Sequence, residues 1–312
     1  MSALAPPVGP VGTGSPETGK ASRPARAGRK TPYLLLLPGM AWLAVFFAVP
    51  MLFLASTSLQ TGSLEQGYVL TWHVQTYVDA LTAYYPQFIR SIGYAASATV
   101  LGVLIGYPLA YAIAFKAGRW KNVLLVMVIA PFFTSFLIRT LAWQTILSNN
   151  GPVVDFFQAT HLIDVMQFLG LTNNDQLMAS KFAVICGLTY NFLPFMTLPL
   201  YASLERVDQR LLEAAGDLYS SPFTAFRKIT LPLSMPGLVA GTLLTFIPAC
   251  GDYINSKLLG STNTTMIGQV IDGQFLRVLD YPTAAALSFV LMITIVVLVA
   301  VYVRRAGTEE LV

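Results

Sequence analysis

Long runs of hydrophobic residues, separated by short polar connections, occupy most of the chain. A membrane-spanning helix needs about 20 predominantly apolar residues. Four runs reach that length without Asp, Glu, Lys or Arg, at residues 33–57, 91–115, 182–204 and 281–303. Two further runs are less regular, because Arg139 interrupts residues 122–147 and a proline-rich segment opens residues 231–251. The pattern predicts six transmembrane helices, the first of them within residues 33–58.

Composition supports an all-α integral membrane protein. Of the 312 residues, 55% are hydrophobic and only 11% are charged, and the mean hydropathy is +0.62. A soluble globular domain has about 25% charged residues. We therefore expect the lipid bilayer to surround most of this chain. The mild net charge of +4 gives no indication of a nucleic-acid partner.

Basic residues are concentrated in alternate connections, which predicts the orientation of the spans. Connections that are translocated across a membrane tend to be poor in Lys and Arg. In a six-span chain the two termini, the 116–121 turn and the 205–230 connection lie on one side, and these segments carry most of the basic residues. We expect a multi-pass protein of the cytoplasmic membrane with both termini in the cytoplasm. The opposite connections carry most of the acids, among them Glu65, Asp79, Asp155, Asp164, Asp175, Asp272 and Asp280.

The two tails are expected to contribute no fold of their own. Residues 1–32 are rich in Pro, Gly, Ala and Ser, which indicates a disordered cytoplasmic tail. A secretory signal peptide fits less well, because its apolar region would be about 7–15 residues long. Residues 14–21 resemble a P-loop, but Ala21 stands where a metal-binding Ser or Thr is needed. We expect no cofactor here, and residues 304–312 form a second cytoplasmic tail.

Catalytic and metal-binding patterns are absent from the sequence. His73 and His161 fall in different connections, and Cys186 and Cys250 fall in different spans. We therefore do not expect an enzyme. A six-span channel or a membrane enzyme is the alternative, and either would need a charged pore ring or a cluster of catalytic polar residues in the spans.

The charged connection over residues 204–232 is predicted to form two short helices. Apolar residues recur in its first half at spacings of three and four, which indicates an amphipathic helix. Ser221 and Pro222 are suited to begin a second helix, which Pro232 would end. A connector that only rests on the lipid surface is the alternative interpretation. The apolar stripe of the first helix is Leu204, Val207, Leu211, Ala214 or Ala215, and Leu218, and that of the second is Phe223, Phe226 and Ile229.

Glu213-Ala214-Ala215, followed by Ile229 and by Leu231-Pro232, resembles the loop by which permease subunits of binding-protein-dependent ABC importers contact their ATPase. We refer to residues 204–232 as the coupling loop. The resemblance implies a type I permease bundle with cytoplasmic coupling helices, in which cargo crosses by alternating access. It also implies three kinds of partner: a second homologous permease subunit, two copies of an ABC ATPase subunit and an extracytoplasmic substrate-binding protein.

The resemblance extends over residues 85–303. Residues 131–143, 251–260 and 266–268 are similar to segments of spermidine/putrescine-type permeases, so polyamine is the expected cargo. Related subfamilies carry ferric iron, thiamine or phosphonate, and these cargoes stay open as alternatives. The residues expected to couple to the ATPase are Glu213, Ala214, Ala215, Asp217, Tyr219, Ile229, Leu231 and Pro232.

Tyr219 departs from the family pattern, which usually has Gly at the turn between the two coupling helices. A bulky residue at positive φ is uncommon. We therefore expect the turn to use residues 220–222, or a different backbone path, and Tyr219 to avoid that conformation.

Two charges near membrane depth, Arg139 and Asp252, are candidates for the substrate path, since such residues usually mark a pathway or a pair. Counted along their spans, both are expected toward the outer face. A mutual ion pair, or snorkelling to the interface, is one interpretation. In the other, Asp252 contacts an ammonium group of the cargo, while Trp143, Tyr190 or Tyr253 offers an aromatic face to the cation.

Glycines spaced four apart predict close contacts between membrane helices. The pairs are Gly102 with Gly106 and Gly237 with Gly241. The alternative is that these glycines are ordinary residues of membrane helices.

Overall fold

The computed structural model describes residues 31–149, 151–168, 170–172 and 176–306. The predicted tails lie outside the described residues, except for residues 31–32 and 304–306. The chain divides into two units, Met1–Met51 and Leu52–Val312, and each is described by itself.

The first predicted span is a helix whose apolar side chains are not buried by the rest of the described chain. It consists of α1, Thr31–Leu43, a π-helical segment, Ala44–Ala48, and α2, Val49–Ser58, which crosses the boundary between the units. Its large apolar side chains are exposed, as Leu36 at 60% and Trp42 at 65% illustrate. Apolar exposure on this scale is what a helix surrounded by lipid or by another chain requires.

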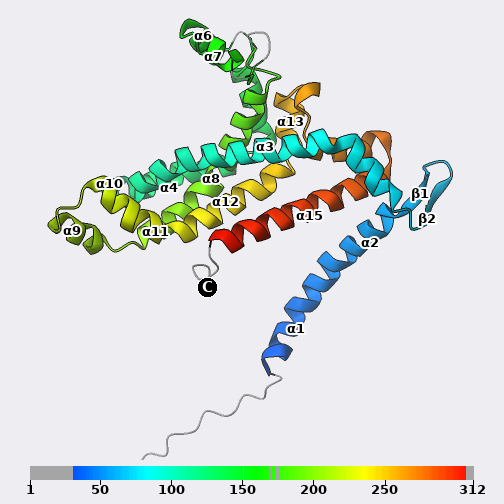
Figure 1. Ribbon diagram of the computed structural model, residues 1–312, viewed down its shortest axis with the longest axis horizontal. Helices are drawn as coiled ribbons and strands as arrows, with labels where there is room; N and C mark the ends of the chain where they lie inside the picture. The colour runs from blue at the N-terminus through cyan, green and yellow to red at the C-terminus, as the bar shows by residue number, and fades with distance from the viewer. Residues whose placement is uncertain (1–30, 150, 169, 173–175, 307–312) are drawn as a thin grey trace, which may run out of the picture. The chain divides into compact units, whose positions relative to one another are not determined.

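The second unit contains the other predicted spans, which run from the cyan α3 to the red α15 in Figure 1. Three of them are single helices: α3, Gln75–Tyr111, with a π-helical extension to Lys116; α8, Lys181–Glu205; and α15, Tyr281–Ala306. With the first span, four helices of the described chain are long and apolar enough to cross a membrane, and two bent pairs raise the number to six. The all-α membrane fold is confirmed.

The third span is broken by a bend that the sequence analysis did not predict. Its first half is α4, Lys121–Ile129, with a 3-10 extension to Phe133, and its second half is α5, Phe136–Ile146. The two halves are bent by 96°. Thr134 and Ser135 adopt extended backbone between them, and Thr134 Oγ1 donates to the Pro131 carbonyl at 2.7 Å. The break therefore precedes Arg139, at the residues that follow a proline.

The fifth span is shorter than predicted, because residues 231–233 form a separate short helix. They form α11, Leu231–Leu233, which ends one residue beyond Pro232. The span itself is α12, Met235–Cys250, and it is bent by 64° from the preceding helical segment, Pro222–Leu233. The bend falls at Ser234, whose Oγ forms a hydrogen bond with the Tyr107 hydroxyl at 2.8 Å.

Helix α8 lies at the centre of the second unit, packed against both α3 and α12. The glycines that were predicted to be contact positions allow this packing. A Cβ at Gly237 would lie 2.5 Å from the Pro199 carbonyl oxygen of α8, and one at Gly241 would lie 3.0 Å from the Met196 carbonyl oxygen. On α3, a Cβ at Gly106 would lie 3.1 Å from Met196 Cγ. The glycines are thus contact positions between helices.

A β-hairpin and several short helices complete the second unit. Strands β1, Gln60–Ser63, and β2, Gly67–Leu70, pair antiparallel, and Gly67, the first residue of β2, has a positive φ of 79°. The sequence analysis did not predict this hairpin. Helices α6, Pro152–Ala159, and α7, Leu162–Phe168, protrude from the bundle near α13, Ile254–Leu259 (Figure 1). Helix α14, Ile267–Gly273, continues as a π-helical segment to Val278.

Candidate functional site

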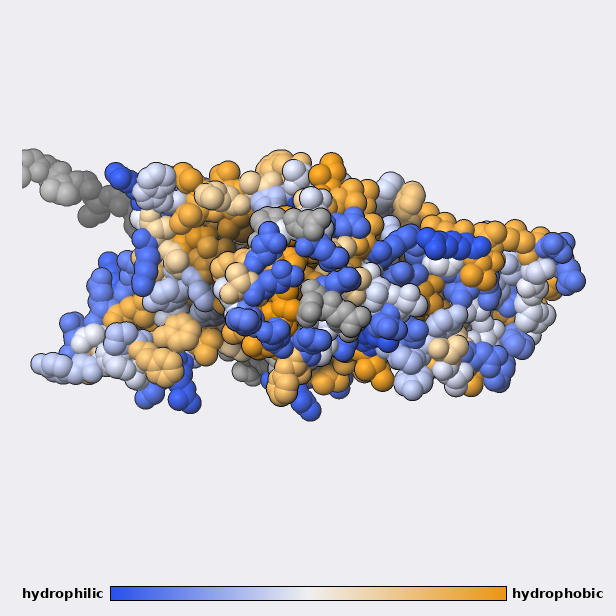
Figure 2. All heavy atoms as spheres, turned by 90° about the horizontal axis from the view of Figure 1, so that it is seen from above, coloured by the Kyte–Doolittle hydropathy of each residue, from blue (hydrophilic) through white to orange (hydrophobic). Residues whose placement is uncertain are grey.

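The coupling loop begins with α9, Gln209–Asp217, which lies with α10, Pro222–Ala225, at one end of the second unit (Figure 1). Hydrophilic side chains gather at this end in Figure 2, while broad hydrophobic areas are visible elsewhere on the same face. Asp208 precedes α9, and its Oδ1 accepts a hydrogen bond from the backbone N–H of Arg210 at 3.0 Å. This cap satisfies one of the backbone donors at the helix start.

The apolar stripe predicted for this helix is only partly buried. Leu204 belongs to α8 and is fully buried, and Val207 is 7% exposed in the connection. Within α9, Ala215 is 8% exposed, but Leu211 is 46% exposed. Leu218, just after α9, is 81% exposed. The chain therefore leaves apolar side chains uncovered on and beside α9.

The turn after α9 has Tyr219 in the left-handed conformation, with φ 57°, so the prediction that Tyr219 avoids positive φ was wrong. Two backbone hydrogen bonds hold it: Tyr219 N–H to the Gly216 carbonyl at 2.9 Å, and Ser220 N–H to the Ala215 carbonyl at 3.0 Å. This is the Schellman pattern, in which Gly usually occupies the left-handed position. Tyr219 follows the same path despite its side chain, which is 99% exposed.

The Glu-Ala-Ala residues do not all lie on one surface. Glu213 and Ala214 are exposed, as is Asp217, whereas Ala215 is buried within this chain. The two alanines, both expected to couple to the ATPase, therefore differ in their exposure. Ala214 can meet a partner directly, and Ala215 supports the loop from inside.

The second half of the coupling loop is anchored to the bundle. Ser221 caps α10 as predicted, because its Oγ accepts a hydrogen bond from the Thr224 N–H at 3.2 Å. A π-helical segment, Phe226–Thr230, follows and leads into α11. Leu231 packs against the cluster of buried residues that contains Leu204. Ile229 and Leu231 are partly buried, while Pro232 is exposed.

An ion pair joins the coupling loop to the short turn after α3. Lys121 Nζ lies 2.6 Å from Glu205 Oε1, and it also lies 5.4 Å from the centroid of the Tyr201 ring. A polar recess of about 590 Å³ lies beside this pair, and Arg206, Asp208 and Arg210 contribute to its lining. The two connections predicted to share one side of the membrane thus lie in contact.

Arg139 and Asp252 do not form the predicted ion pair; among the described residues neither has an oppositely charged partner within 4.0 Å. Asp252 is 8% exposed, and its Oδ1 accepts the backbone N–H of Asn255 at 2.8 Å at the start of α13. Arg139 is 9% exposed, and its Nε and Nη1 are buried without a hydrogen-bond partner. Snorkelling of Arg139 to the interface stays a prediction.

Three buried residues from three helices form a polar cluster that the sequence analysis did not identify. Asn191 of α8 donates through Nδ2 to Thr140 Oγ1 of α5 at 3.3 Å and to Asn255 Oδ1 of α13 at 3.1 Å. All three residues are at most 1% exposed. Asn191 Oδ1 and Asn255 Nδ2 have no partner. The polar cluster ties the second half of the broken third span to the central helix.

The aromatic residues proposed for the substrate path fall into two groups. Trp143 and Tyr190 pack edge to face with ring centroids 5.6 Å apart, and Tyr190 is 37% exposed. Tyr253 is 41% exposed, and its ring lies 5.8 Å from Lys257 Nζ, which pairs with Asp272 at 2.8 Å. A cation of this chain thus already occupies one face of Tyr253.

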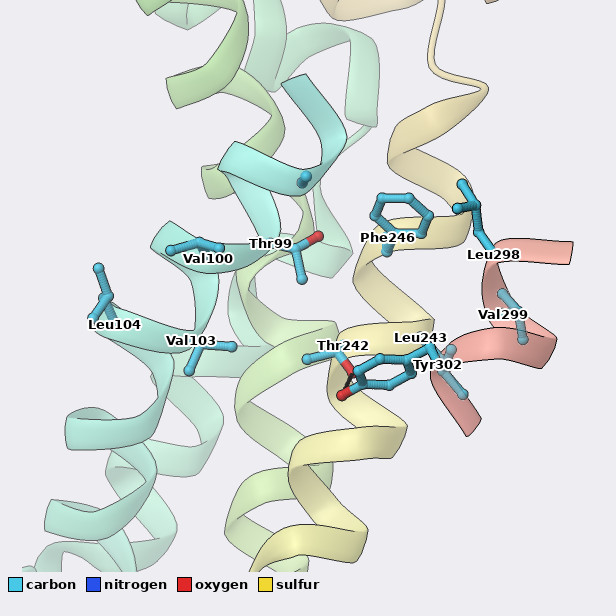
Figure 3. Close-up of a pocket in the computed structure, with 11 residues that line it drawn as sticks. Thr99, Val100, Val103, Leu104, Thr242, Leu243, Phe246, Leu298, Val299 and Tyr302 are labelled. Atoms are coloured by element: carbon cyan, nitrogen blue, oxygen red, sulfur yellow. Dashed lines mark hydrogen bonds between the residues drawn. The ribbon is translucent and has the colours of Figure 1, made fainter. Parts of the chain in front are cut away.

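A groove between α3, α12 and α15 is lined almost entirely by apolar side chains (Figure 3). It encloses about 450 Å³, and Thr99, Thr242 and Tyr302 are its polar residues. Thr242 Oγ1 donates to the Tyr302 hydroxyl at 2.8 Å, so these two satisfy each other. A groove without a charged group is unsuited to a polar or charged cargo.

Comparison with known proteins connects these features to transport. Residues 100–306 match the family described as "Binding-protein-dependent transport system inner membrane component". The spermidine/putrescine transport system permease protein PotB of Haemophilus influenzae is 34% identical over 85% of this chain and 90% of its own length. PotB of Escherichia coli is 35% identical over 86% of this chain and 94% of its own length.

A solved structure shares the fold. It is that of a bacterial ABC transporter involved in the import of the acidic polysaccharide alginate, with a TM-score of 0.58 and 19% identity over 88% of this chain and 94% of that chain. At 19% sequence identity, this similarity shows that the two chains share a fold and nothing more. Together with the family match over two thirds of the sequence, it supports the all-α permease fold. The chain belongs to the family of inner membrane components of binding-protein-dependent transport systems.

Proposed function

We propose that this chain is a permease subunit of an ABC importer that moves polyamines, of the spermidine and putrescine class, across the cytoplasmic membrane by alternating access. The observation that carries the proposal is the coupling loop, which presents Glu213 and Ala214 exposed on a capped helix at one end of the bundle. The cargo follows from the relatives named PotB, which resemble this chain over more than four fifths of its length.

The coupling loop serves as the contact with a partner ATPase. Glu213 supplies the charged contact, Ala214 permits close approach, and Asp217 and Tyr219 extend the same exposed surface. Ala215, Ile229 and Leu231 have the different task of fixing the loop to the helices behind it. Movement of the ATPase is thus transmitted to α8 and α12, the two helices that the loop connects.

The importer is completed by a second homologous permease, two ATPase subunits and an extracytoplasmic binding protein. Both termini and the coupling loop lie in the cytoplasm, and residues 85–303 form the transport domain between residues 1–32 and 304–312 as tails. The contact between Lys121 and Glu205 supports this orientation, because it brings two basic connections to one side.

The cargo path runs past Asp252, Trp143, Tyr190 and Tyr253. A carboxylate and an aromatic ring face are both groups that can bind an ammonium group. Asp252 is mostly buried, and its Oδ1 accepts a hydrogen bond from the Asn255 N–H. Arg139 has the wrong charge to contact such a cargo and acts beside the path.

Transport by the complete complex tests the proposal. The complex reconstituted in vesicles is expected to take up labelled spermidine only when ATP and the binding protein are present. Uptake of iron, thiamine or phosphonate without spermidine would reassign the cargo, and solute flux without the ATPase would favour a channel.

One variant tests the path separately. Asp252→Asn keeps the Oδ1 acceptor for Asn255 and removes only the charge. It should raise the spermidine concentration for half-maximal uptake about tenfold, as loss of a charge-assisted contact implies. An unchanged concentration removes Asp252 from the path. Adding Arg139→Gln should not restore uptake, because the two side chains are not paired.

The orientation is tested by labelling. A cysteine placed at Ser221 in a cysteine-free chain should react only with reagents that enter the cytoplasm, and one at Thr160 should react from outside. The reverse pattern would overturn the topology.

A further inference from the structure

We infer that the polar cluster positions the carboxylate of Asp252 for the cargo, and that it does so through Asn255. The inference rests on the proposed function, in which Asp252 contacts an ammonium group. Asn255 takes part in both arrangements. Its backbone N–H donates to Asp252 Oδ1 at 2.8 Å, and its side-chain Oδ1 accepts from Asn191 Nδ2 at 3.1 Å. One residue therefore connects the carboxylate to the central helix α8.

The segment that carries Asp252 is not held by regular secondary structure. Residues 251–253 form non-helical backbone between α12 and α13. They lie close to the level of Asn191, which at 1.5 Å per residue is about 15 Å from the Lys181 end of α8. Non-helical backbone at such depth is tolerated where it is buried in protein or lines a water-filled path. The place of Asp252 is therefore set by the contacts of its own segment.

Close packing restricts this segment on two sides. On the side of α8, a Cβ at Gly187 would lie 2.8 Å from Asn255 Oδ1. Gly187 precedes Asn191 by about one helical turn, so the two residues form the surface on which the Asn255 side chain packs. On the side of α14, a Cβ at Gly268 would lie 3.0 Å from the Asp252 carbonyl oxygen. The segment has little room to move while Asn255 stays on α8.

Stability alone does not explain why these contacts are polar. Apolar side chains of the same shape can hold helices together about as well as a buried hydrogen-bonded pair. Among the described residues, Asn191 Oδ1 and Asn255 Nδ2 have no hydrogen-bond partner, which is a cost to stability. Hydrogen bonds are directional, however. The cluster therefore fixes the orientation of Asn255, and with it the N–H that holds Asp252.

Uptake kinetics of the complete complex in vesicles test the inference. Asn255→Ala removes the side chain that packs on α8 but keeps the backbone N–H that donates to Asp252. It should raise the spermidine concentration for half-maximal uptake at least about threefold, as loss of coupling within one hydrogen-bond network implies. In the Asp252→Asn background the same change should add little, because no charge is left to misplace. A purely structural role would lower the amount of assembled complex and leave that concentration unchanged.

Two further variants provide a second probe and a control. Thr140→Val removes the hydroxyl that bonds to both asparagines, and it should raise the same concentration even if Asn255→Ala does not assemble. Thr189→Val is the matched control in α8. Thr189 is buried as well, but its Oγ1 donates to the Ile185 carbonyl of its own helix at 2.8 Å. Its loss should leave the concentration unchanged.

The outcomes separate the inference from the proposed function. A raised concentration in Asp252→Asn, together with unchanged values in Asn255→Ala and Thr140→Val, overturns the inference and leaves the cargo path. Additive effects in the double variant, or an equal rise in Thr189→Val, also overturn it. An unchanged value in Asp252→Asn contradicts the proposed cargo path, and the inference with it.

Discussion

The coupling loop and the bundle around α8 hold their polar groups in opposite ways. In the loop, each cap joins residues two to five apart in sequence, as Asp208 to Arg210 and Ala215 to Ser220 show, and the charged side chains stay exposed. In the bundle, the polar cluster joins residues 51 to 115 apart, and they are at most 1% exposed. A structure closed by local bonds can present charges to a partner without depending on that partner to fold. The polar cluster instead forms only when three helices of the bundle are in place.

The difference predicts that changes in the loop impair transport while the protein still folds, and that changes in the bundle impair folding first. Glu213→Ala should have the largest effect on uptake. It would remove the proposed charge-assisted contact with the ATPase, worth about 1.5–3 kcal/mol, and Glu213 is exposed in this chain. We expect ATP-driven uptake to fall at least about tenfold, with normal membrane insertion. Uptake assays and ATPase retention measure the two outcomes, and normal uptake would reduce the loop to a connector.

Gly237→Ala should have the largest effect on the bundle. Its Cβ would lie 2.5 Å from both the Pro199 carbonyl oxygen and Ser203 Oγ, so α12 must move away from α8. Overpacking of this kind costs about 1–3 kcal/mol. The midpoint of thermal unfolding in detergent should fall. Gly93→Ala in α3 is the control, because nothing lies within 4 Å of its Cβ and the change should be neutral or slightly stabilising.

Two neighbouring alanines of α9 allow the exposed loop surface and the buried interior to be compared within a single helical turn. Ala214→Leu places bulk on the exposed surface and should weaken ATPase retention while leaving the thermal midpoint unchanged. Ala215→Leu places the same bulk inside the chain and should lower the free energy of unfolding by about 1–3 kcal/mol. Equal effects of the two variants on both quantities would show that the loop and the bundle are not separate.

Tyr219→Gly should have the smallest effect and the opposite sign. A left-handed residue with a Cβ is less stable there than Gly by about 1–2 kcal/mol. Part of that gain is lost because Gly gives the unfolded chain more freedom. The thermal midpoint should rise slightly. Tyr219→Ala, which keeps a Cβ, should leave it unchanged, and a fall in Tyr219→Gly would mean that the tyrosine ring stabilises the turn.

The elements that the sequence predicts well are those fixed by neighbouring residues. The lengths of the apolar runs gave the membrane helices, and Ser221 before Pro222 gave the start of α10, because each signal lies within a few residues. The turn at Tyr219 was mispredicted for an energetic reason. The strain of a left-handed tyrosine is about 1–2 kcal/mol, which two backbone hydrogen bonds offset.

The polar cluster could not be predicted in the same way. The amide of Asn191 within an apolar run was a signal that something polar must meet it, but Thr140 and Asn255 are identified only once three helices are placed. The prediction of an ion pair between Arg139 and Asp252 was wrong for the same reason. Distance along each span located both residues at a similar depth, but depth does not determine which side of a helix faces which neighbour.

Met196 lies where α3 and α12 pack against α8, and its flexibility lets these helices move relative to one another. It is fully buried, and the glycines at positions 102, 106 and 241 would each place a Cβ within 4 Å of it. A branched side chain in that place would lock α3 and α12 against α8 in one register. The thioether of methionine is unbranched and changes rotamer easily. The Met196 side chain can therefore adjust its conformation, so that the three helices can shift past one another during a transport cycle without opening a void between them.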